Sequence, residues 1–240
     1  MDHNDFVFPP GIYKRHEIPV ADYLMSFQDA LREDFMKGFS TLEEAIKAQG
    51  MDNLDRRAYG VPLEKTAKGI VRKNDEGNFQ PDVTAWKGVN FRYELHNDEA
   101  DISLTMDSEF ETRYPTAFKL IKEYGDKCPI ANYSCLAPNT VLHRHTGIEN
   151  RDGKYIRIHI PLIIPPGDVF LEVNGEESTW DDLFGLNNQM VHSAHNYTNE
   201  YRLIFMIDLE REFIGMPKGE PYDPRLEKFA RPHIRKGKHE

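Results

Sequence analysis

The sequence has too few cysteines for a disulfide framework and no apolar run long enough to cross a membrane. Its 240 residues include 2 cysteines, Cys128 and Cys135, whose number and spacing fit neither a disulfide scaffold nor a zinc motif. No run approaches the roughly 18 apolar residues of a spanning helix. The acidic N-terminus also lacks the apolar core of a secretory signal. We therefore expect a cytoplasmic protein with two reduced thiols and no membrane span.

Positive charge is also scarce. The chain has 30 Lys and Arg against 40 Asp and Glu, which gives a net charge of −10 with histidine neutral. Binding to a phosphate backbone relies on a surplus of basic side chains, so we expect no nucleic-acid partner. Hydrophobic residues make up 39% and charged residues 29%, which is typical of a globular protein with a sizeable core.

Helical periodicity is confined to two parts of the chain. Apolar residues recur at helical spacing over 19–49, and the motif STLEE within it resembles a helix start, so we predict two helices there. Residues 50–85 are polar and interrupted by Gly and Pro, which predicts loops. A further helix is predicted over 114–125, ended by Gly125.

Short β-branched and aromatic runs begin at about residue 129, separated by clusters of Pro, Gly, Asn and Asp. They are PIANYSCLA, YIRIHIPLII, VFLEV and YRLIFMIDL. In YIRIHIPL, the apolar side chains from Ile156 to Leu162 face one way, whereas Arg157 and His159 face the other. A strand whose second face bears Arg and His indicates a polar cavity, as in the mouth of a barrel.

Polar residues on four segments are candidates for one site. They are His145, Arg157 with His159, His192, and Arg202. Two histidines on separate strands of a small barrel can converge on one metal ion, and imidazole suits Fe, Zn, Cu and Ni alike. The planar guanidinium group suits a carboxylate. A metal beside a carboxylate anchor is what an Fe(II) enzyme that uses 2-oxoglutarate requires.

From about residue 114 to 210 the chain resembles the aspartyl/asparaginyl β-hydroxylase family of 2-oxoglutarate-dependent oxygenases. The resemblance rests on HTG at 145–147, RIH at 157–159, His192, RLIF at 202–205 and Ser134 in NYSCLAP. It implies a mainly β protein with flanking helices, built on a double-stranded β-helix, which is a jelly-roll or cupin-like barrel. The expected division is an N-terminal helical and loop region over 1–95, the oxygenase core over 96–214, and a C-terminal extension over 215–240.

The resemblance also implies cofactors and roles. Fe(II), 2-oxoglutarate and O2 are the expected cofactor and cosubstrates, with His145 and His192 as the iron ligands. The residues expected to contact 2-oxoglutarate are Ser134, Arg157, His159, Arg202 and Tyr93. No catalytic residue beyond the metal ligands is expected.

Alternatives for the metal site stay open. His143 lies on the same side of an extended strand as His145, so it is a candidate second-sphere partner or substitute ligand. The carboxylate of the usual facial triad would lie two residues after the first histidine, at Gly147, and the resemblance implies that water takes this place. Glu149 and Asp152 are candidate ligands, although an exposed loop also explains them.

Three other residues are expected to have structural roles. We expect Trp180 to cover the barrel, His195 to lie in a solvated turn and Asp208 to stand at the end of a strand. Substrate binding is the alternative role for His195, which lies three residues after His192.

The implied reaction is hydroxylation of an aliphatic C–H bond in an amino acid, a small metabolite or a peptide residue, with release of succinate and CO2. Mammalian members of the family pair the substrate carboxylate with an arginine two residues before the RxH arginine, and Tyr155 stands there in this chain. One alternative is a halogenase that binds chloride in the vacant ligand position. The other is a non-enzymatic cupin-like protein that binds a metal or a small acid.

Overall fold

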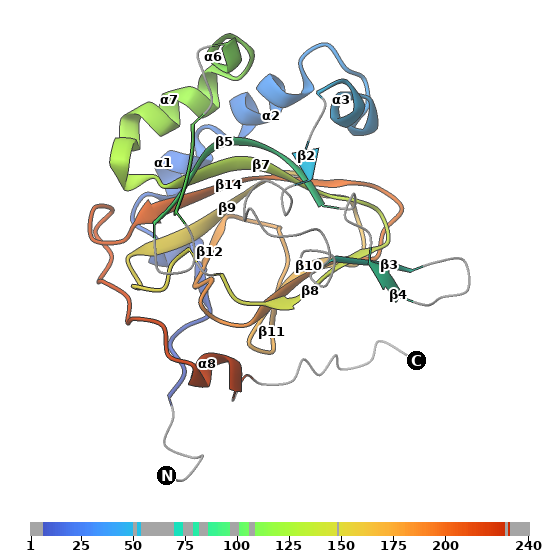
Figure 1. Cartoon of the computed structure of the whole chain (residues 1–240). Coiled ribbons are helices and arrows are strands. Elements are labelled where there is room, and N and C mark those ends of the chain that lie inside the picture. Colours follow the sequence, from blue (N-terminus) through green and yellow to red (C-terminus); the bar gives the residue numbers. More distant parts are fainter. Residues whose placement is uncertain are drawn as a thin grey trace.

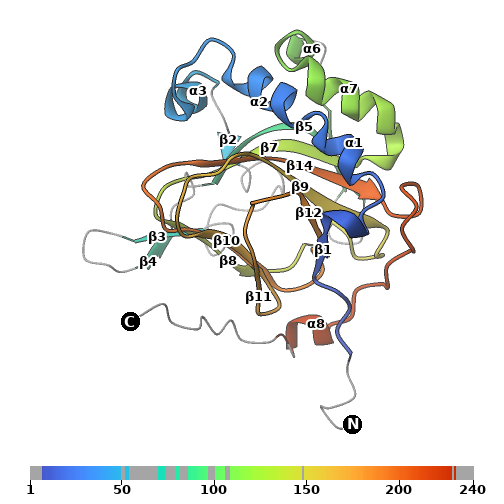
Figure 2. The same cartoon turned by 180° about the vertical axis from the view of Figure 1, so that it is seen from behind.

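Two antiparallel β-sheets face each other, and helices cover the outer face of the larger sheet (Figure 1). The view from behind shows the same layers, with the smaller sheet on the side away from the helices (Figure 2). The computed structural model describes residues 7–49, 52–53, 70–73, 79–81, 86–96, 101–105, 109–147, 149–228 and 230. The prediction of a mainly β, double-stranded β-helix with flanking helices is confirmed.

The larger sheet supplies one wall of the barrel. Its order is β1 (Ile12–Lys14), β12 (Phe184–Leu186), β9 (Tyr155–Ile163), β14 (Arg202–Glu210), β7 (Ile130–Leu136), β5 (Trp86–His96) and β2 (Asp52–Asn53), with β6 (Asp101–Thr105) paired to β5. Strands far apart in the sequence are therefore neighbours, and β14 lies between β9 and β7.

The smaller sheet supplies the opposite wall. Its order is β11 (Glu176–Ser178), β10 (Val169–Val173), β13 (His192–Asn196), β8 (Thr140–His145), β3 (Ile70–Lys73) and β4 (Phe79–Pro81). The loop prediction for 50–85 is wrong at β2, β3 and β4, and the rest of that span up to residue 85 lies outside the described residues. These strands are short, so their periodicity gives little signal.

Helices pack on the outer face of the larger sheet. The helical elements are η2 (Arg15–Glu17), α1 (Ala21–Met25), α2 (Gln28–Met36), α3 (Leu42–Ala48), α6 (Glu109–Arg113), α7 (Pro115–Tyr124), η3 (Gly125–Lys127) and α8 (Arg225–Lys228). Three α-helices rather than two fill 19–49, and the Thr41 side chain caps the last one as part of a capping box. Helix α7 ends at Gly125, whose φ is +52°, as predicted. Within the described residues, no helix is long and apolar enough to span a membrane.

Strand β9 separates the core from the barrel interior. Its residues Ile156, Ile158, Ile160 and Leu162 are buried against the helices, as the alternation predicted. Burying each such side chain stabilises the fold by roughly 1.5–3 kcal/mol. The residues between them point into the barrel, where Arg157 lies opposite Asp208 and His159 opposite Met206 on β14.

The C-terminal segment packs against the loop between β8 and β9. The backbone N–H of Gly219 donates to the Gly153 carbonyl at 3.1 Å, and that of Tyr222 donates to the Arg151 carbonyl at 2.7 Å. Gly153 has a φ of +71°, and a Cβ there would lie 2.3 Å from a backbone oxygen of this segment. Only glycine therefore allows this approach. These contacts fix the loop at one end of the barrel.

Candidate active site

One cavity between the sheets collects nearly all the predicted site residues. Those that line it are Ser134, His145, Arg157, His159, His192 and Arg202. Tyr93 is buried in β5 in register with Ile130 and does not line this cavity. The structure therefore brings six predicted residues together, whereas the assignment of Tyr93 to the cosubstrate stays a prediction.

The two candidate metal ligands lie side by side on the smaller sheet. His145 ends β8 and is the register partner of His192, which begins β13, and their ring centroids are 4.3 Å apart. Nδ1 of His192 lies 2.8 Å from the Met190 carbonyl, so it carries the proton and leaves the Nε2 lone pair available. Burial and the nearby His145 hold the pKa of His192 well below its ordinary value. A neutral, oriented imidazole is the form that binds a metal ion.

The position of the missing carboxylate is occupied by other side chains. A Cβ on Gly147 would lie 2.5 Å from the Asn188 amide nitrogen and 3.0 Å from a Glu149 carboxylate oxygen. In the described part of the chain, no group of three or more His, Cys, Asp or Glu residues has an arrangement suited to a metal ion. The donors present therefore fit a metal held by two histidines, with other positions left to water or cosubstrate.

Glu149 belongs to a buried ion-pair network rather than to an exposed loop. Its side chain is only 1% exposed, and its Oε1 accepts a hydrogen bond from Arg157 Nη2 at 2.5 Å. Arg157 also donates to both oxygens of Asp208, at 2.8 and 2.9 Å. The Glu149 side chain is thus not exposed, as the loop explanation required. Asp208 is the main partner of Arg157, because it accepts two hydrogen bonds from it. One guanidinium is shared by two carboxylates.

The pKa values of the two carboxylates shift in opposite directions. Burial opposes ionisation of Glu149, but the Arg157 charge and hydrogen bond outweigh it and hold the pKa of Glu149 below its ordinary value. Burial and the neighbouring Glu149 charge raise the pKa of Asp208, although Arg157 opposes this. The network therefore has a surplus of negative character next to the histidines.

Arg202 is buried without a counter-ion. It is 3% exposed, and within the described residues its side chain forms no ion pair and its Nε has no hydrogen-bond partner. Its guanidinium carbon lies 4.7 Å from the ring centroid of Trp180. Burial lowers the pKa of Arg202 from 12.5 to about 10. Ser134 lies in the same cavity, and its hydroxyl accepts a hydrogen bond from Trp86 Nε1 at 2.9 Å.

His159 also presents a polar atom to the cavity. Its Nδ1 accepts a hydrogen bond from Trp180 Nε1 at 3.2 Å, so in the neutral ring the proton is on Nε2. This Nε2 is buried and has no partner among the described residues. Burial and the two cavity arginines hold the pKa of His159 well below its ordinary value. The side chain is therefore a neutral hydrogen-bond donor.

The open space between these groups is small. It amounts to about 30 Å³, which is enough for about one or two water molecules. A cosubstrate with two carboxylates requires side chains to move. Trp180 and Arg202 are the side chains that we expect to move, because they stack on each other without a hydrogen bond between them.

The fold and these donors define a cupin-like oxygenase barrel. The chain belongs to the aspartyl/asparaginyl beta-hydroxylase family, whose profile matches residues 57–212. The predicted resemblance is confirmed, and the protein is a 2-oxoglutarate-dependent oxygenase. The family implies Fe(II), 2-oxoglutarate and O2. No curated protein matches the chain.

Solved structures of three oxygenases align with part of this chain. A Pseudomonas putida prolyl-4-hydroxylase is 12% identical, with a TM-score of 0.35, and the match covers 70% of this chain and 81% of that one. A Trichoplax adhaerens prolyl hydroxylase in complex with a hypoxia inducible factor peptide fragment is 13% identical, with a TM-score of 0.31 and coverages of 80% and 94%. A Burkholderia pseudomallei 2OG-Fe(II) oxygenase is 8% identical, with a TM-score of 0.37 and coverages of 58% and 73%.

Sequence reasoning missed part of this site. Trp180 lines the cavity and orients His159, so its role is more than covering the barrel. His195 is buried in β13 and stacks on Phe170 at 4.4 Å, so the expectation of a solvated turn is wrong. The spacing on β14 gives a signal for Asp208, because it lies six residues after Arg202 and therefore shares its face of the strand.

Proposed function

We propose that this oxygenase hydroxylates an aliphatic C–H bond of an amino acid, a small metabolite or a peptide residue. One oxygen atom of O2 enters the substrate as a hydroxyl group, and the other enters succinate as 2-oxoglutarate loses CO2. The observation that carries this proposal is a buried arginine that has no counter-ion among the described residues and shares its cavity with two adjacent histidines.

His145 and His192 would hold Fe(II), which supplies the activation of O2 that C–H hydroxylation needs. Two features support this assignment. The lone pair of His192 Nε2 is available because Nδ1 faces the Met190 carbonyl, and burial keeps the ring neutral. The side chains of Asn188 and Glu149 occupy the space beside Gly147, so a third protein ligand from that position has no room.

Arg202 and Ser134 are the anchor that we assign to the distal carboxylate of 2-oxoglutarate. A bidentate carboxylate would supply the counter-ion that Arg202 lacks among the described residues. His159 Nε2 would donate to the other end of the cosubstrate. Arg157 already forms ion pairs with Glu149 and Asp208. Its predicted contact with 2-oxoglutarate would therefore be made in addition to these ion pairs, and the pair with Asp208 would orient the guanidinium group.

Anaerobic titration with Fe(II) and 2-oxoglutarate tests this proposal. Chelation by the cosubstrate is expected to produce a visible charge-transfer band. In the Arg202→Met variant, 2-oxoglutarate affinity should fall about thirtyfold or more, since losing one partner of a buried charged pair costs at least about 2 kcal/mol. The exposed Arg225→Met is the matched control and should behave like the native protein. Native-like affinity in Arg202→Met would show that the anchor lies elsewhere.

The halogenase alternative is disfavoured by the charge beside Gly147. Chloride in the vacant ligand position would face the carboxylate of Glu149, whose oxygen lies 3.0 Å from the position of a Cβ on this glycine. Like charges in a buried site repel strongly. Hydroxylation that is independent of chloride is the expected result, and a chlorinated product would contradict it.

A further inference from the structure

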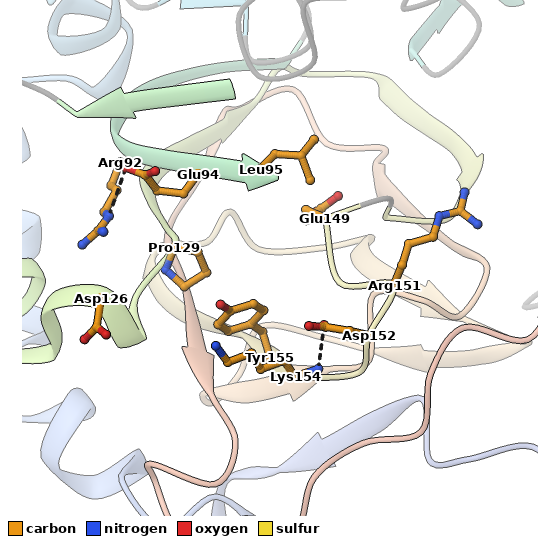
Figure 3. Close-up of a pocket in the computed structure, with 10 residues that line it drawn as sticks. All are labelled: Arg92, Glu94, Leu95, Asp126, Pro129, Glu149, Arg151, Asp152, Lys154 and Tyr155. Carbon is orange, nitrogen blue, oxygen red and sulfur yellow. Dashed lines mark hydrogen bonds and ion pairs between the residues drawn. The ribbon is translucent and has the colours of Figure 1, made fainter. Parts of the chain in front are cut away.

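A second cavity opens between β5, the loop after β8 and the start of β9 (Figure 3). We call it the mouth cavity. It has a volume of about 350 Å³ and is lined by the end of β5, the loop 149–154 and the start of β9. Glu149 lies in its wall, and Arg157, the hydrogen-bond partner of Glu149, lines the histidine cavity. The two cavities therefore meet at this ion pair, and the side chains of Glu149 and Arg157 separate a molecule in the mouth cavity from the histidine cavity.

The basic groups of the mouth cavity already have partners. Arg92 forms an ion pair with Glu94 at 3.6 Å, and Lys154 forms one with Glu210 at 3.3 Å. The Arg151 guanidinium lies 4.2 Å from the ring centroid of a tyrosine in the C-terminal segment. The charges of Arg92 and Lys154 are therefore already balanced by carboxylates, although Nε of Arg92 donates no hydrogen bond within the described residues.

The acidic group at the base of the cavity is only half satisfied. Oε1 of Glu149 accepts hydrogen bonds from Arg157 and from the Asn188 amide at 3.0 Å. Its Oε2 is buried and has no hydrogen-bond partner within the described residues. A buried carboxylate oxygen without a donor is costly, so a ligand that brings a donor stabilises the site. A positively charged donor satisfies it best.

The aromatic wall of the cavity fits the same kind of ligand. Tyr155 lines the cavity beside Glu149, and its ring already lies 5.3 Å from the Lys154 ammonium group. A ring face attracts a cation through its quadrupole and gives an anion no such attraction.

We propose that the mouth cavity binds the substrate through a positively charged group, an ammonium or guanidinium, that donates a hydrogen bond to Glu149 Oε2. This inference rests on the proposed oxygenase function and names its substrate class as a cationic amine, such as a basic amino acid or peptide side chain. The ion pair with Arg157 would then hold the bound substrate next to the histidine cavity.

Calorimetric titration with two probes of equal chain length, pentylamine and pentanol, tests the inference on the full chain. Pentylamine should bind more tightly than pentanol. Glu149→Gln keeps the shape of the side chain but removes its charge, and it should weaken pentylamine binding about tenfold or more while leaving pentanol unchanged. Glu43→Gln removes a charge from an exposed helix and should keep native affinity for pentylamine. Equal affinity for both probes, or native pentylamine binding in Glu149→Gln, would overturn the proposal.

A second variant covers the case in which Glu149→Gln does not fold. Tyr155 is half-buried, so Tyr155→Arg is expected to fold and to bring its own cation to Glu149. It should weaken pentylamine binding by a similar factor, and unchanged binding would contradict the assigned subsite. Succinate release in the presence of amines separates the two proposals. If amines bind through Glu149 but the Fe(II)-loaded protein neither binds 2-oxoglutarate nor releases succinate, the proposed function fails and the cation subsite stands.

Discussion

The two cavity arginines differ in their partners, so removing them should change stability in opposite directions. Arg202 has no counter-ion among the described residues, and burial lowers its pKa from 12.5 to about 10. Each pKa unit corresponds to about 1.4 kcal/mol between the charged and neutral forms, so keeping this charge buried costs about 3 kcal/mol. Losing the contact with Trp180 offsets about 1 kcal/mol of that.

Arg202→Met should therefore stabilise the protein by about 1–2 kcal/mol. Arg157→Met should destabilise it by about 3–5 kcal/mol, because Asp208 and Glu149 would remain buried without their shared cation. In a chain of this size, 1 kcal/mol shifts Tm by about 2–4 °C. The expected changes are a rise of about 4 °C for the first variant and a fall of about 10 °C for the second.

Differential scanning calorimetry of protein freed of metal and 2-oxoglutarate measures both changes. Adding 2-oxoglutarate to the Fe(II)-loaded protein should then raise Tm of the native protein much more than that of Arg202→Met, because only a bound ligand stabilises the folded state. A fall in Tm of Arg202→Met as large as that of Arg157→Met would refute the reasoning, since it would mean that Arg202 is a satisfied structural group.

Four further predictions follow from the site. His145→Ala should lose Fe(II) binding in calorimetric titration, whereas His143→Ala should retain it; the reverse pattern would shift the ligand by two residues. Binding of 2-oxoglutarate should change tryptophan fluorescence, and Trp180→Phe should remove most of that change, because the indole must leave the narrow cavity. Gly147→Ala should lower Tm and weaken metal binding, because its Cβ would lie 2.5 Å from a buried amide nitrogen; a native Tm would show that the amide moves freely. Burial keeps His159 neutral when folded, so the unfolded chain binds its proton first. The contribution of His159 to stability, measured by urea unfolding, should fall by about 1.4 kcal/mol per pH unit below about pH 6.5, and His159→Gln should reduce the overall slope by that amount.

The sequence predicted the site residues that sit on strongly alternating strands. Arg157 and His159 were assigned to the cavity face of β9 because the isoleucines between them face the helices, and the structure has them there. His145 and His192 came from motifs, and the register of β8 with β13 brings them together. Local periodicity and spaced motifs therefore identified the serine, histidine and arginine residues of the cavity wall, but not its apolar and tryptophan residues.

What the sequence did not reveal depends on contacts between distant segments. Glu149 lies in a polar loop, and it is buried because Arg157 and Asn188 hold its carboxylate. Trp180 follows a turn between short strands, and nothing local predicts that its indole stacks against Arg202. Such roles arise from tertiary packing, which residue types and spacing do not record.

On the two proposals made above, the charges of the two cavities would let one barrel hold both a cosubstrate and a substrate of opposite sign. Arg202 stands alone at the inner end, next to Ser134, and favours a dianionic cosubstrate there. Arg157 lies between the two cavities, where Asp208 and Glu149 together outnumber its single charge. The same residue type therefore produces a positive site at one end and a negative one at the other. Because the sign is set by the carboxylates around each arginine, Glu149 is the residue through which the preference at the mouth can be reversed without changing the inner site.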